Sequence, residues 1–71
     1  MQDVIEKLMS LYALNTMRLK ETRELREITK EQNHRDFYDG QITELKRIVI
    51  NLEDVINTYF QNHLLMVVLD L

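Results

Sequence analysis

The stretch ITELKRIVINLEDVINTY, residues 42–59, decides the fold of this chain. Its apolar residues recur at alternating steps of three and four, at Ile42, Leu45, Val49, Leu52, Ile56 and Tyr59. On an α-helix this spacing gathers the side chains into one stripe, the heptad pattern of helices that pack lengthwise against other helices. We call this stripe the seam. It predicts a helix whose packing partner is another helix.

The composition of the chain favours helix throughout. Its 71 residues include no cysteine, no proline and one glycine, so no disulfide supports the fold and almost nothing breaks a helix. Apolar residues make up 45% and charged residues 30%, which is too apolar for a disordered tail and too charged for a membrane protein. A chain of this length forms one small domain at most and buries a modest share of its surface. We therefore expect a single all-α domain that needs partners.

Charge and hydropathy argue against export and membrane insertion. Asp3, Glu6 and Lys7 interrupt the first apolar stretch, so no signal peptide is expected there. The apolar residues 64–69 are far fewer than the ~20 that a membrane-spanning helix needs. The formal charge of -3 is weak and gives no basic excess for nucleic acid. We expect a cytoplasmic protein without a membrane span.

Residues 2–36 are predicted to form the first helix. Its first half is apolar over more than half of the circumference, from Val4 to Leu19, which is more than one partner helix covers. Its second half is largely charged, and there we expect the seam to run through Leu25 and Ile28.

A turn is expected at residues 37–40, because Asp39-Gly40 favours a turn and Gly40 is the one residue that takes positive φ without strain. The second helix then covers residues 41–63 or more, followed by an apolar tail at 64–71. The alternative is one continuous helix in a coiled coil, because Leu14 and Ile28 fall in the same heptad column as Ile42.

Folding the chain at this turn makes a two-helix antiparallel hairpin with its most apolar segments at the open end. The apolar surface left over predicts a homodimeric four-helix bundle built from two hairpins. The residues expected to mediate self-association are Val4, Leu8, Leu11, Leu14, Leu25, Ile28, Ile42, Leu45, Val49, Leu52, Ile56, Tyr59 and Met66.

No pattern of residues predicts catalysis or a cofactor. Glu31 and His34 have the i, i+3 spacing of metal ligands in helical bundles, but they lie off the seam and no second such pair faces them. His63 continues the column of the seam, where a hydrogen-bonded core histidine is the expected role. Ser10 lies within an apolar helix and Gly40 stands alone, so neither a nucleophile nor a phosphate-binding loop is predicted. We expect no metal, no cofactor and no enzymatic activity.

Residues 52–59, Leu-Glu-Asp-Val-Ile-Asn-Thr-Tyr, resemble part of the second helix of a family of small phosphatases that act on response regulators in spore-forming bacteria and are also helical hairpins. Val49 and Ile50 stand where that family has a Ser-Gln pair, and Glu53 stands where it has Asp. Apolar heptads resemble one another, and no activity is carried over to this chain.

The function predicted from these features is contact with other proteins. We expect a small adaptor or regulator that self-associates and binds another protein through a helical face. The alternative is a nucleic-acid-binding bundle whose phosphate contacts come from Arg18, Arg23, Arg26 and Lys30. The glutamates beside these cations would repel phosphate, so a protein partner is the preferred prediction.

Overall fold

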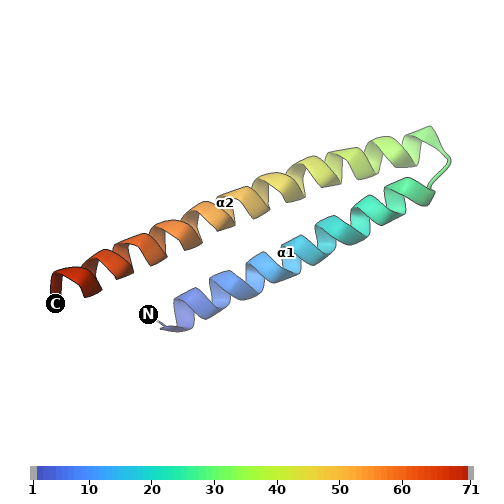
Figure 1. Ribbon diagram of the computed structural model, residues 1–71. Coiled ribbons are helices and arrows are strands. Elements are labelled where there is room, and N and C mark those ends of the chain that lie inside the picture. Colours follow the sequence, from blue (N-terminus) through green and yellow to red (C-terminus); the bar gives the residue numbers. More distant parts are fainter. Residues whose placement is uncertain (1, 71) are drawn as a thin grey trace.

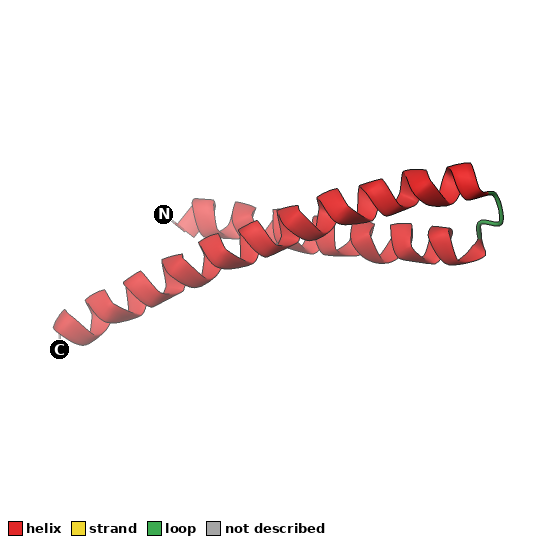
Figure 2. Ribbon diagram, turned by 90° about the horizontal axis from the view of Figure 1, so that it is seen from above, coloured by secondary structure: helices red, strands yellow, loops and turns green. Residues whose placement is uncertain are grey.

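The chain folds as an antiparallel helical hairpin. The computed structural model describes the backbone of residues 2–70 and the side chains of residues 3–62. Helix α1, Gln2–Ile28, and helix α2, Gln32–Asp70, lie side by side, and no strand occurs within the described backbone (Figure 1). The molecule measures 59 × 16 × 13 Å, and the two helices cross at a shallow angle (Figure 2). The predicted all-helical hairpin is confirmed, and the alternative of one continuous helix is wrong.

The turn lies at residues 29–31, not at 37–40 as expected from the sequence. Its backbone is held by side chains on both sides: the Thr29 hydroxyl donates to the carbonyl of Leu25 at 2.7 Å, and Arg35 Nε donates to the carbonyl of Thr29 at 2.7 Å. The amide of Arg35 also donates to the carbonyl of Glu31 at 3.0 Å. These bonds satisfy polar groups that two adjoining helix ends leave without partners inside the helices.

Asp39 and Gly40 lie inside α2 instead, so the first helix ends earlier and the second begins earlier than predicted. Gly40 has no positive φ, it is exposed, and an added Cβ would meet no atom within 4 Å. The Asp39 carboxylate reaches across to Arg26 of α1, at 2.5 Å from its Nε. Contacts between the helices thus override the local turn preference of Asp-Gly. Placing Gly40 inside a helix costs little, because a single glycine in a helix is tolerated.

Gly40→Ala distinguishes the two turn positions. In a helix with open space around the residue, alanine is expected to raise the free energy of unfolding by about 0.5–1 kcal/mol. Urea denaturation followed by circular dichroism measures the change. A loss of stability would instead indicate the strained glycine conformation of a turn at this position.

The seam of α2 faces α1, as predicted. Val49 is 9% exposed, and the other five seam residues of α2 are half-buried. On α1, the expectation that the seam runs through Leu25 and Ile28 is wrong, because these side chains are 44% and 75% exposed. The residues of α1 that are buried or half-buried between the helices also recur at alternating steps of three and four, at Ile5, Leu8, Tyr12, Asn15, Leu19, Thr22 and Arg26.

The phases of these two stripes explain why the chain folds back. Steps of seven residues from Ile5 lead to position 40, two residues before the matching seam position Ile42. At about 100° per residue, the two stripes would lie ~200° apart on one continuous helix, on nearly opposite faces. A continuous helix would therefore present no unbroken seam to a partner helix. A reversal of the chain instead lets each stripe cover the other.

Two polar side chains are buried in the α1 stripe. Asn15 donates from Nδ2 to the carbonyl of Leu11 at 2.8 Å, and the Thr22 hydroxyl donates to the carbonyl of Arg18 at 2.7 Å. Each finds a partner within its own helix, so burial leaves no described buried side-chain polar atom unsatisfied. They also leave only Leu19 and Val49 as buried apolar side chains in the described part of the hairpin. The core between the two helices is therefore thin.

Candidate functional site

Most of the large apolar side chains that the hairpin exposes lie on one side of it. We call this side the outer face, and define its apolar members as Val4, Leu11, Leu14, Leu25 and Ile28 of α1 with Phe37, Ile48 and Val55 of α2. These are eight of the twelve large apolar residues that are exposed in the described part of the chain, so the concentration on one side is more than scattered surface apolarity.

The heptad positions explain why these residues share a side. Val4, Leu11 and Leu25 each come directly before a position of the α1 stripe, and Ile48 and Val55 each come directly before a position of the α2 seam. In an antiparallel pair, equivalent flanking positions of the two helices meet on the same side of the seam. The members at 14, 28 and 37 lie one helical turn from these flanking positions, farther from the seam.

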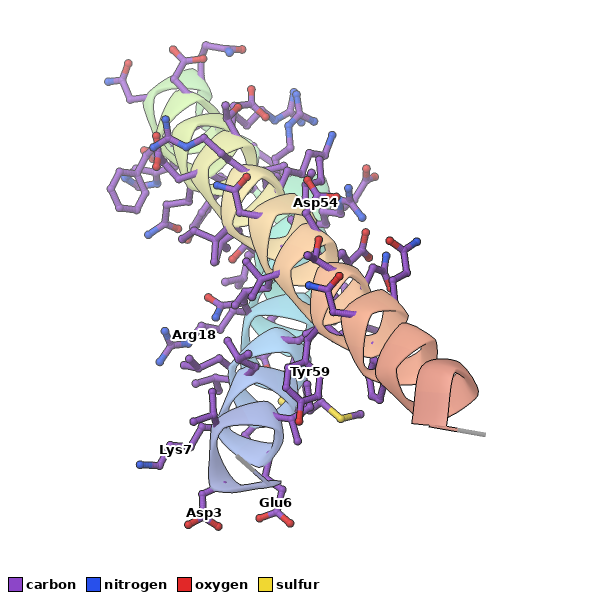
Figure 3. All side chains as sticks on the ribbon, turned by 90° about the vertical axis from the view of Figure 1, so that its left-hand side faces the viewer. Asp3, Glu6, Lys7, Arg18, Asp54 and Tyr59 are labelled. Atoms are coloured by element: carbon purple, nitrogen blue, oxygen red, sulfur yellow. The ribbon has the colours of Figure 1, made fainter. Side chains whose placement is uncertain are left out.

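A groove confirms this placement near the turn. This open groove has a volume of about 740 Å³ and is lined by both helices. Leu25 lies on one wall, Phe37 and Ile48 lie on the other, and Leu45 of the seam lies between them. Four charged side chains also line it: Arg18, Glu21, Asp36 and Glu44. Arg18 and Lys7 project on the same side of α1 (Figure 3). The outer face therefore has an apolar surface interrupted by a band of charges.

The opposite side of the hairpin is less apolar. Its groove, of about 500 Å³, is lined by Met9, Tyr12 and Ala13 of α1 and by Glu53, Ile56 and Asn57 of α2. The Tyr12 hydroxyl donates a 2.6 Å hydrogen bond to Oε1 of Glu53 across this groove. That bond is the main cause that raises the pKa of Tyr12, because the neutral hydroxyl is the form that donates to the carboxylate.

The raised pKa of Tyr12 predicts a loss of stability in alkali. The folded chain holds the phenol proton more tightly than the unfolded chain does, so the contribution is complete below the ordinary pKa of 10.0 and is lost as the pH rises through the folded value. Tyr12→Phe removes this contribution. The difference in free energy of unfolding between wild type and variant, measured from about pH 8 to pH 11, is expected to shrink as the pH rises. A difference independent of pH would contradict the cross-helix bond.

The four cations considered for phosphate contact do not form one stripe. Arg26 faces α2 and pairs with Asp39, a contact that raises the pKa of Arg26 above its ordinary value. Arg18 lies on the outer face, ~140° around α1 from Arg23. Arg23 lies on the other side of the α1 stripe, and Lys30 lies in the turn at residues 29–31. The hairpin thus separates Arg18 from the remaining cations.

The residues considered for chemistry are also separated. Glu31 and His34 are exposed and lie 3.5 Å apart, and no group of three or more potential metal ligands occurs among the described side chains. Helix α2 continues through most of the predicted tail, to Asp70, while the side chains of His63 and Met66 lie outside the described residues. Within the described part of the chain, neither helix is long and apolar enough to cross a membrane.

The structure divides the predicted self-association residues into two sets. Leu8 and the six seam residues of α2 face the interior of the hairpin, whereas Val4, Leu11, Leu14, Leu25 and Ile28 form the α1 part of the outer face. Sequence reasoning missed Phe37, Ile48 and Val55 as members of that face. Ile48 and Val55 could have been found from the sequence, because they are seven residues apart and each directly precedes a seam residue.

Comparison with protein-family models, curated proteins and solved structures gives no match for this chain. The function must therefore be inferred from the surface of the hairpin itself.

Proposed function

We propose that this chain is a small helical interaction module, an adaptor or regulator, that self-associates through its outer face as a homodimeric four-helix bundle and binds another protein through a helical face. The observation that carries this proposal is the outer face, where eight large apolar side chains are exposed on one side of the described hairpin. Covering such a surface is favourable by roughly 25 cal/mol for each Å² of apolar area removed from water.

The thin interior of the hairpin supports the same proposal. Only two apolar side chains are buried between the described parts of the helices, so a two-helix hairpin without disulfides gains stability from any further apolar burial. A second hairpin placed on the outer face adds a second apolar layer and completes a four-helix bundle. The proposed self-association thus provides part of the stability of the fold.

Linked association and folding give a direct test. If the folded chain is a dimer, its thermal unfolding temperature rises with protein concentration, because association stabilises the folded state by mass action. Circular dichroism melts over about a hundredfold range of concentration are expected to show this rise. An unfolding temperature that is constant over that range would count against self-association.

A further inference from the structure

The α1 part of the outer face has a pattern that reads the same in both directions. Two apolar residues are followed by a charged pair and then by two apolar residues, at alternating steps of three and four: Leu11, Leu14, Arg18, Glu21, Leu25 and Ile28. All six side chains are exposed in the hairpin. Because reversal exchanges Arg18 with Glu21, the stripe is complementary to an inverted copy of itself in both hydropathy and charge.

We infer that the occupant of the outer face is a second copy of this chain, whose α1 packs antiparallel against α1 about a two-fold axis at the level of Leu19 and Lys20. This inference rests on the proposed self-association and specifies its geometry. Each Leu11 then faces Ile28 of the second copy, and each Leu14 faces Leu25 of the second copy. Such a self-complementary contact is the isologous type that two-fold dimers use.

The charged pair fixes the direction of packing. In the antiparallel arrangement Arg18 faces Glu21 of the second copy, and the symmetry makes this ion pair twice. If the two α1 helices ran parallel, Arg18 would face Arg18 and Glu21 would face Glu21. Like charges placed against one another disfavour that arrangement, so the charge pattern selects one orientation and one register.

The ionic contacts within the hairpin leave this pair available. Arg26 is paired with Asp39 and Arg47 with Glu44, whereas neither the side chain of Arg18 nor that of Glu21 makes a hydrogen bond or ion pair with another described residue. Arg18 is exposed at the rim of the groove on the outer face and projects on the same side of α1 as Lys7 (Figure 3). A partner in the outer face would therefore meet both charges without first breaking a contact.

Reversing the two charges tests the pairing. Arg18→Glu and Glu21→Arg each place like charges together twice in the dimer, so each variant is expected to self-associate roughly tenfold more weakly than wild type. The double variant Arg18→Glu/Glu21→Arg restores both pairs and is expected to regain the wild-type affinity. Both positions are exposed and helical, and Arg and Glu have similar helix propensities, so the hairpin itself is preserved. Sedimentation equilibrium gives the affinities.

Cross-linking tests the orientation independently. The chain has no cysteine, so Leu14→Cys and Leu25→Cys each introduce a single thiol. With a short bis-maleimide linker, the antiparallel dimer predicts cross-linked dimer in a mixture of the two variants and none in Leu14→Cys alone, because position 14 then lies ~16 Å along the helix from its own copy. A parallel dimer predicts the reverse.

The outcomes separate this geometry from the proposed function. A wild-type dimer in which both charge reversals leave the affinity unchanged, or in which Leu14→Cys cross-links to itself, overturns the antiparallel pairing and leaves self-association standing. A wild-type chain that stays monomeric overturns the self-association on which the pairing rests.

Discussion

Replacing Leu14 with glutamate is expected to abolish self-association while the helical hairpin persists. Leu14 is 43% exposed in the hairpin, so the change costs little within one chain, but in the proposed dimer the side chain lies against Leu25 of the second copy. Because the dimer is two-fold symmetric, it contains two substituted contacts. At each of them apolar burial is lost and a carboxylate lies against an apolar partner. We expect a loss of at least ~3 kcal/mol in association, more than about a hundredfold in affinity.

Met17→Glu is the matched control for this prediction. Met17 lies on the same helix three residues away, is 57% exposed and belongs to neither the seam nor the outer face. Sedimentation velocity is expected to give a monomer for Leu14→Glu and the wild-type distribution for Met17→Glu, with similar helical circular dichroism in both. If Leu14→Glu associates as wild type does, the outer face is not the interface.

Replacing Leu19 with alanine is expected to destabilise the hairpin by about 2–4 kcal/mol. Leu19 is 8% exposed and is one of only two buried apolar side chains in the described hairpin, so its truncation opens a cavity in an already small core. Because so little apolar surface is buried elsewhere between the helices, the remaining contacts offset little of this loss. Urea denaturation at a fixed protein concentration measures it.

Met17→Ala serves as the reference for this substitution, because Met17 is exposed and alanine is favoured in a helix. Its effect on the free energy of unfolding is expected to stay within about 0.5 kcal/mol. If Leu19→Ala changes the stability as little as Met17→Ala does, the α1 stripe does not pack against the seam.

The sequence predicts the α2 side of the fold well because its signal is uninterrupted. Every seam position from Ile42 to Tyr59 carries a large apolar or aromatic residue, and all six of these residues are buried or half-buried against α1. The α1 stripe obeys the same spacing but carries Asn15 and Thr22, whose polar side chains bond to their own helix. A search for apolar periodicity therefore selects Leu14 and Ile28 in place of Leu19.

The position of the turn was predicted wrongly for a related reason. Asp39-Gly40 is a strong local turn signal, whereas residues 29–31 carry none of comparable strength. The offset between the two stripes is incompatible with one unbroken seam, and it depends on residues spread over the whole chain, not on a local turn signal. The pairing of Arg26 with Asp39 fits this register and could not be found from the turn signal.

The outer face was predicted only in part, because composition shows surplus apolar surface but not how it divides. Leu11 and Leu25 were assigned to self-association without a distinction between the interior of the hairpin and its outside. Once the hairpin places Leu8 inside and Leu11 outside, the six-residue stripe and its charged centre become visible as one surface.

If a second copy of this chain covers the outer face, sedimentation equilibrium of the wild-type chain at micromolar concentrations detects it. The chain has a mass of 8.6 kDa, and we predict a folded species of twice that mass. A fully helical, folded species of 8.6 kDa throughout the concentration range would contradict self-association through the outer face.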